Sequence, residues 1–250
     1  MHHSISRSLL LLFAASAITF ALFKTMDNSH AASSLTVIDH LKMADDDTAN
    51  GNPLVAKWEG PYGGVPPFDR VKVAFFKPAL EAAMAEQLGE IDKIAKNTAA
   101  PNFENTIVAL EEAGKTLNRV GTIYAVWSST MNGPDFQAVQ REMAPKLAAF
   151  GDQITQNEAL FKRIETLYNS TDKAKLNAEQ QRLVWLYHTN FVRAGAKLSP
   201  EAKSRLSQIN QELAGLFTKF NQNVLAEEND QFLLLKSEDE LAGLPQSLRD

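Results

Sequence analysis

The stretch that decides the fold is residues 199–228, SPEAKSRLSQINQELAGLFTKFNQNVLAEE. It opens on Ser199 and Pro200, a pair that favours a helix start because serine caps free amide groups and proline fits the first helical position. Apolar residues then recur every three or four positions, the period of one helix face. They are Leu206, Ile209, Leu213, Leu216, Phe217, Phe220 and Val224. We predict one helix over residues 200–228, about 45 Å long at 1.5 Å per residue.

The same spacing extends back along the chain to Phe76. The expected helices cover about residues 76–97, 105–127, 136–154, 158–168 and 178–194. Asn105 is a good N-cap for the second of these, and Pro145 predicts a kink or a break in the third. The apolar run 232–235 is the one strand candidate. We therefore expect a mainly all-α fold, a multi-helix region with one short β element near its C-terminal end.

The N-terminus has the pattern of a secretory signal peptide. Arg7 precedes an apolar run over residues 9–23, which Lys24 and a polar stretch ending in small residues follow. Fifteen apolar residues are fewer than the roughly 20 that span a bilayer. We expect residues 1–31 to be a signal peptide and the protein to be exported, in the periplasm, with no stable membrane insertion after cleavage. An uncleaved anchor is the alternative.

The remaining chain divides by composition. Residues 32–51 are polar and indicate a flexible leader. Residues 52–75 form a Pro/Gly-rich entry strap whose aromatic side chains (Trp58, Tyr62 and Phe68) predict that it packs down in order. Residues 76–229 form the helical domain. Residues 230–250 start the next β/α segment, and we expect truncation there because a new helix begins just before the end.

Charge and cysteine content exclude several classes of function. The net charge is −5 and no dense Lys/Arg stripe occurs, which argues against a nucleic-acid partner. The chain has no cysteine, so disulfides, thiolate zinc sites, a cysteine nucleophile and a lipoprotein anchor are excluded.

No catalytic constellation emerges from the motifs. The sequence contains no His-Glu-x-x-His, the pattern that places two zinc ligands on one helix face. His188 is the only histidine in the predicted folded region, and we interpret it as a helix-face residue and not a ligand. We predict no catalytic, cofactor-binding or metal residue in this chain.

The weaker candidates have structural interpretations. Residues 60–64 (GPYGG) lack the context of a nucleotide loop and indicate a turn. The acidic pairs at 111–112 and 227–228 point in different directions on a helix, and residues 128–130 (SST) lack a paired base. An aromatic set is expected to be core and not a ligand cage; it comprises Tyr124, Trp127, Trp185, Tyr187 and Phe191.

Five stretches, in order, resemble one known family. Residues 103–111 (FENTIVALE), continuing through Gly114, Leu117 and residues 119–120, resemble the N-terminal helical signature of the thimet oligopeptidase family of zinc metallopeptidases. Residues 191–198 (FVRAGAKL) resemble a signature of its peptidyl-dipeptidase Dcp branch. The strap at 60–69 and residues 210–225 and 240–245 agree with it. The similarity runs from about residue 52 to the end.

The resemblance implies a largely helical zinc peptidase with a deep channel that admits short peptides, and in this branch it implies release of dipeptides from free C-termini. It implies zinc held by the two histidines of His-Glu-x-x-His and a downstream glutamate, while the motif glutamate activates water. Those residues lie several hundred positions beyond Asp250 in full-length members, so none is carried onto this sequence. We expect this chain to form the wall of the channel and to be inactive alone.

Two hypotheses follow. In the first, the chain is an N-terminal fragment of an exported peptidyl-dipeptidase, and its isolated wall exposes apolar surface that the missing part covers. In the second, it is a free-standing helical module that binds peptides or a partner without catalysis.

Overall fold

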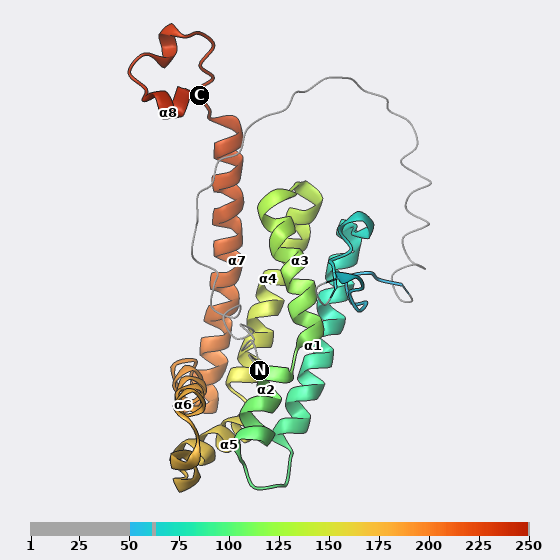
Figure 1. Ribbon diagram of the computed structural model, residues 1–250, viewed down its shortest axis with the longest axis vertical. Helices are drawn as coiled ribbons and strands as arrows, with labels where there is room; N and C mark the ends of the chain where they lie inside the picture. The colour runs from blue at the N-terminus through green and yellow to red at the C-terminus, as the bar shows by residue number, and fades with distance from the viewer. Residues whose placement is uncertain (1–50, 62–63, 250) are drawn as a thin grey trace.

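A computed structural model describes residues 51–61 and 64–249 of the chain (Figure 1). The predicted signal peptide at 1–31, the leader up to residue 50, and Tyr62 of the strap lie outside these described residues. The described part is mainly α-helical, as predicted. Across this part the only β pairing is an isolated antiparallel bridge between Glu59 and Val65.

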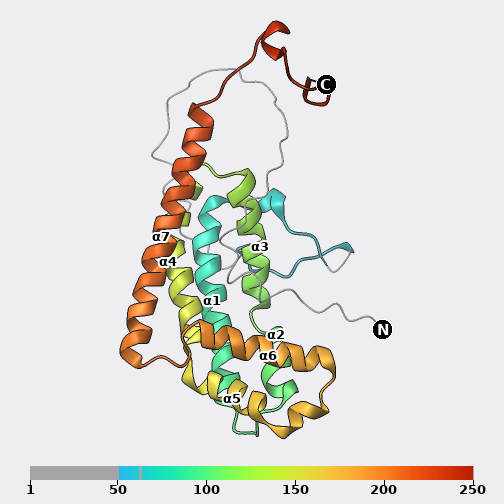
Figure 2. The same cartoon turned by 90° about the vertical axis from the view of Figure 1, so that its left-hand side faces the viewer.

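The helices form an upright layer with a crosswise pair at one end (Figures 1 and 2). The upright helices are α1 (Val73–Ala95), α3 (Lys115–Thr130), α4 (Pro134–Thr155) and the long α7 (Pro200–Asp230). The end is closed by α5 (Glu158–Asn169) and α6 (Ala178–Arg193), with η4 (Phe103–Val108) and α2 (Ala109–Glu112) between α1 and α3. Short turns complete the order: η3 (Phe68–Arg70), η5 (Thr171–Lys175), η6 (Asp239–Leu241) and α8 (Gln246–Arg249). Helix α4 lies between α1 and α7 and contacts both.

The upright layer is built around the fully buried ring of Phe76 on α1. This ring makes edge-on contacts with Tyr124 and Trp127 of α3, at 5.8 and 5.4 Å between centroids, and with Phe136 of α4 at 5.0 Å. Such pairs contribute about 0.5–1.5 kcal/mol each beyond the area they bury. Burial also raises the pKa of the Tyr124 phenol to about 12. One side chain thus joins three helices.

The periodic residues of the sequence form this core. On α1 the predicted face is buried at Phe76, Leu80, Met84, Ile91 and Ile94. On α4 the buried apolar residues are Phe136, Met143, Phe150 and Ile154, as the spacing predicted. Of the aromatic set, Trp127, Tyr187 and Phe191 are buried and Tyr124 packs on the core. The prediction is wrong for Trp185, which lies on the outside of α6 with the Arg182 guanidinium 3.9 Å from its ring centre.

Two buried polar side chains fasten the crosswise end. The Tyr187 hydroxyl donates to Glu111 Oε1 at 2.5 Å, and burial together with this bond raises the pKa of Tyr187. Arg163, on α5, donates to the carbonyls of Asn97 and Ala99 at 2.5 and 3.0 Å. Burial lowers the pKa of the Arg163 guanidinium. The two Arg163 bonds satisfy carbonyl groups of the loop after α1, which would otherwise lack these partners.

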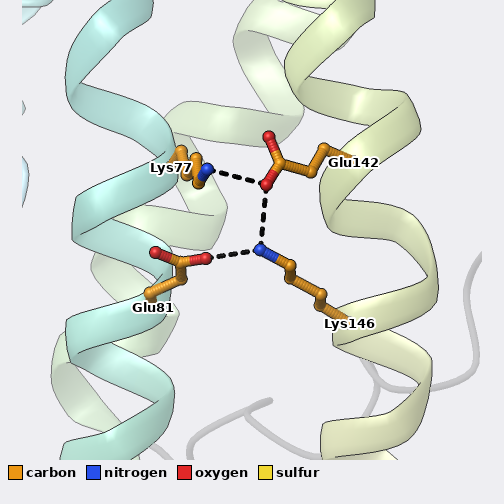
Figure 3. A network of polar contacts seen from close by, with 4 residues as sticks. All are labelled: Lys77, Glu81, Glu142 and Lys146. Atoms are coloured by element: carbon orange, nitrogen blue, oxygen red, sulfur yellow. Dashed lines mark hydrogen bonds and ion pairs between the residues drawn. The ribbon is translucent and has the colours of Figure 1, made fainter.

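A half-exposed network of charges spans α1 and α4 (Figure 3). Lys77 Nζ lies 2.7 Å from Glu142 Oε1, and Lys146 Nζ lies 2.6 Å from Glu81 Oε1 and 2.9 Å from Glu142 Oε1. The hydrogen bonds from Lys77 and Lys146 lower the pKa of Glu142, and those to Glu81 and Glu142 raise the pKa of Lys146. Because water screens exposed pairs, we assign the network to the alignment of the two helices and not to a large share of stability.

The predicted helix over 105–127 is interrupted. Asn102, not Asn105, caps its start, in a reciprocal capping box where each asparagine side chain accepts from the other's backbone amide. The chain then breaks at Gly114, whose φ of +75° is in the left-handed region. Its amide donates to Glu90 Oε2 at 2.7 Å. The break therefore depends on a contact with α1 that local spacing does not contain.

Two further expectations change at the C-terminal half. The strand predicted at 232–235 does not form in the described residues, because no segment pairs with it, and its four side chains are exposed. Helix α4 continues through Pro145, so the alternative of a break there is wrong. Proline removes a single backbone bond from the helix, while Met143 and Phe150 on either side stay anchored in the core.

The entry strap packs against the helices mainly through Leu54 and in part through Trp58. Leu54 is fully buried, and Asn52 Nδ2 donates to the Phe75 carbonyl at 2.9 Å. Trp58 is half-buried against the core while Phe68 is exposed. The turn predicted for residues 60–64 includes Tyr62 and Gly63, which lie outside the described residues; on its flanks, Val65 N donates to the Glu59 carbonyl at 2.9 Å.

We predict that Gly114→Ala lowers the free energy of unfolding by about 1–3 kcal/mol, the cost of holding a non-glycine residue in the left-handed region. Its Cβ would also collide with the Gln87 side chain. The matched control is Gly121→Ala within α3, where a Cβ meets nothing within 4 Å. The control should be neutral or stabilising by up to about 1 kcal/mol. Urea titrations of both variants give the two values, and equal effects would contradict the assignment.

Candidate functional site: the outer face of helix α7

Helix α7 is fastened to α4 by a seam of amides. Asn210 Nδ2 donates to Asp152 Oδ1 at 2.8 Å. Further along the helix, Gln222 accepts from Arg141 at 2.7 Å and donates to the Gln137 carbonyl at 3.0 Å and to Gln140 Oε1 at 3.1 Å. These side chains form their hydrogen bonds only when their donors and acceptors face their partners on α4. The seam therefore fixes the rotation of α7 about its own axis.

The N-terminal end of α7 is fixed as predicted. Ser199 Oγ accepts from the Ala202 amide at 3.3 Å, and Pro200 occupies the first helical position. Lys203 is buried, and its Nζ donates to the Gln156 carbonyl and to Glu158 Oε1 at 3.3 and 3.2 Å. A lysine with a buried stem and paired ammonium is a strong anchor because the unpaired charge would be costly.

The apolar stripe of α7 is exposed from Leu213 onward, whereas Leu206 and Ile209 at its start are half-buried. Leu216, Phe217 and Phe220 are 56%, 54% and 63% exposed. We define the outer face of α7 as Leu213, Leu216, Phe217, Phe220 and Val224, all exposed large apolar residues. They recur at spacings of three and four, so they form one stripe at 100° per residue. By the same count the centre of the stripe lies about 60° around the helix axis from Asn210 and about 180° from Gln222.

The outer face is hollowed between its side chains. The depression is lined by Leu213, Leu216, Phe217, Lys219, Phe220 and Asn223. All six belong to α7, so the hollow is a notched helix surface and not a cleft between elements. Its lining is apolar except for one ammonium and one amide. Such a surface can receive apolar side chains and offers no group for acid–base or nucleophilic chemistry.

His188 lies on a face of α6, where its ring takes part in an aromatic stack. Its ring lies parallel to that of Tyr168, with 3.9 Å between centroids, and also stacks on Phe161 at 5.7 Å. Nε2 lies 3.9 Å from Glu165 Oε1. Burial, followed by the charge of Lys197, lowers the pKa of His188, which favours the neutral ring at pH 7. The hydrogen bond from Lys197 lowers the pKa of Glu165.

The described residues do not fit a zinc ion. Across residues 51–61 and 64–249, no group of three or more His, Asp or Glu side chains converges in a way that could hold a metal. The one histidine with a nearby carboxylate, His188, has its ring stacked between aromatic neighbours. The zinc that the family resemblance implies therefore finds no ligand set in this part of the chain.

The other sequence candidates have structural roles or none. Ser128 Oγ donates to the Tyr124 carbonyl at 2.9 Å and accepts from Gln140 at 3.2 Å, so it is not paired with a base. Glu111 holds the Tyr187 hydroxyl. Glu227 and Glu228 are exposed at the end of α7.

In the part of the chain that the structure describes, no helix combines the length and the apolar character needed to cross a membrane.

Sequence comparison identifies relatives of this chain. No family model matches it. Dipeptidyl carboxypeptidase from Salmonella typhimurium LT2 is 35% identical over 193 residues, which is 77% of this chain and 28% of that protein. The Escherichia coli K12 protein of the same name is 33% identical over the same shares. Oligopeptidase A from Haemophilus influenzae is 28% identical over 186 residues, 74% of this chain and 27% of that protein. The chain thus spans just over a quarter of the length of these curated relatives.

The amide seam makes a prediction about local stability. Gln222→Ala removes three hydrogen bonds to α4, and we expect the C-terminal half of α7 to lose about 1–2 kcal/mol of protection in hydrogen exchange. Asn223→Ala, its neighbour on the outer face, is the matched control and should leave exchange within α7 unchanged. Equal exchange rates in the two variants would contradict the seam.

The stack at His188 makes a prediction about pH. Because the folded pKa is lowered, protonation favours the unfolded chain, so this stability is complete above the ordinary pKa of 6.5 and is lost as pH falls through the folded value. His188→Phe retains a ring against Tyr168 and removes the titration. Between about pH 7.5 and 5.5 the free energy of unfolding should fall more steeply in the parent chain than in this variant. Glu165 stays ionised over this window because its pKa is lowered from 4.5, and parallel curves would contradict the assignment.

Proposed function

Since the homologues of this chain are dipeptidyl carboxypeptidase and oligopeptidase A, peptidases of the thimet oligopeptidase family, we propose that it is the helical N-terminal portion of an exported zinc peptidase that releases dipeptides from the C-termini of short peptides. The observation that carries the proposal is the identity of 33–35% to two dipeptidyl carboxypeptidases along 77% of this chain. The resemblance first seen in short signatures therefore rests on a collinear match.

In this proposal the chain contributes a wall and no chemistry. The full-length family binds zinc through its His-Glu-x-x-His motif, and the bound ion supplies an activated water and a polarised carbonyl. This chain's residues would shape the channel: the Phe76 cluster holds α1, α3 and α4 together, and the amide seam adds α7. A rigid helical wall restricts the entrance to short, extended peptides. The chain alone is then inactive.

The alternative is a free-standing helical module that binds peptides or a partner. The exposed outer face of α7 favours it to the extent that such a face can receive an amphipathic segment. The two proposals differ in one respect. A binding module retains its function in isolation, whereas a channel wall requires the catalytic part.

The test compares the chain alone with a chimera in which it replaces the matched quarter of Salmonella dipeptidyl carboxypeptidase. Both are incubated with zinc and a short N-blocked peptide with a free C-terminus, and dipeptide release is measured. We expect no turnover by the chain and zinc-dependent release by the chimera, abolished by a chelator. Turnover by the chain alone would show a metal site that the described residues lack.

A folded chimera that binds zinc yet releases nothing would count against the proposal. In that case, titration of the peptide into the chain alone decides for the binding module if saturable heat is observed. Export is tested separately, by expressing the chain in bacteria and measuring the molecular mass of the exported protein. The proposed signal peptide predicts a mature mass that lacks about the first 31 residues.

A further inference from the structure

We propose that the outer face of α7 is the surface on which the catalytic portion of the full-length peptidase packs. This inference rests on the function proposed above and adds to it the place of contact. The observation that supports the inference is the position of the stripe. Five large apolar side chains of α7 are exposed, although the same helix is hydrogen-bonded to α4.

The stripe cannot be hidden by turning the helix. Rotating α7 to bury Phe217 and Phe220 would pull Gln222 away from Gln137 and Arg141 and would withdraw Lys203 from Glu158. Buried or half-buried polar groups would then lose their partners, and a buried group left unsatisfied is costly. The outer face is therefore a fixed apolar surface, and covering it requires additional polypeptide.

The length of the relatives indicates which polypeptide covers it. The chain matches 28% of each dipeptidyl carboxypeptidase, so most of a relative's length has no counterpart here. The run after α7 supports the same conclusion, because Phe232, Leu233 and Leu234 are 70%, 85% and 61% exposed. A helix face and the segment that leaves it thus both present apolar side chains. Contiguous exposed apolar surface marks an interface.

A tethered occupant also suits the size of the face better than a second copy does. At roughly 100 Å² for each half-exposed large side chain, five of them offer roughly 500 Å². A stable complex between separate proteins buries about 800 Å² per partner. A segment of the same chain has no such minimum, because the tether keeps its local concentration high.

The test uses the absence of cysteine in this chain. Phe217→Cys places a single thiol on the outer face, and its rate of maleimide labelling is compared in the chain alone and in the chimera with the Salmonella remainder, the labelled peptide being identified by mass. We expect labelling to slow by at least about tenfold in the chimera because burial blocks access. Lys162→Cys, exposed on α5, is the matched control and should label equally in both.

A second readout separates this inference from the proposed function. In an active chimera, Phe217→Asp should lower the melting temperature and the rate of dipeptide release, and Phe217→Leu should restore both. An active chimera in which the thiol of the Phe217→Cys variant labels as fast as in the chain alone overturns the docking face and leaves the proposed function standing. A chimera that is folded, binds zinc and is inactive overturns the function itself. Sedimentation of the chain as a dimer, abolished by Phe217→Asp, would assign the face to a second copy and also overturn the inference.

Discussion

The contact of the Phe76 ring with α3 and α4 organises the structure. Aromatic rings of α3 and α4, two consecutive helices, meet this one buried side chain of the distant α1, at 5.0–5.8 Å between centroids. Because α4 is held there along one side, its other side is presented to α7, and the amide seam from Asp152 to Gln137 then decides how α7 sits. The apolar cluster around Phe76 thus positions α4, the polar seam on α4 positions α7, and the position of α7 leaves its apolar stripe exposed.

The two kinds of contact have different consequences. An apolar core tolerates small rotations of a helix, since its energy depends on buried area and not on direction. A seam of amides does not, because each donor needs its own acceptor at hydrogen-bond distance. A helix that is hydrogen-bonded to its neighbour through amides therefore keeps one rotation about its axis, even when that rotation leaves its apolar residues exposed. This division explains how α7 can be well anchored and still present an exposed apolar face.

Across the described residues no three His, Asp or Glu side chains converge in a way that could hold a metal. Polar groups that could attract attention as catalytic are engaged in holding the fold: Glu111 with Tyr187, Arg163 with the loop after α1, and His188 in its aromatic stack. Their shifted pKa values follow from burial and neighbouring charges. Shifted titration alone is therefore not a sign of an active site in this chain.

Most of the local structure could be predicted from the sequence, because it depends on neighbours in the chain. Helical spacing identified α1, α4, α5, α6 and α7, and the Ser199–Pro200 start of α7 followed from capping rules. Spacing also identified the apolar stripe of α7. The spacing shows that one face of the helix is apolar, but it does not show what that face contacts. The tertiary structure decided the features that arise from contacts between distant residues. These are the break at Gly114, where Glu90 of α1 accepts the amide, and the unpaired run at 232–235. It also decided that Gln222 and Asn210, and not the apolar stripe, face α4. The physical reason is that local propensity depends on residues within one or two helical turns, whereas the choice of buried face depends on which partner completes the hydrogen bonds.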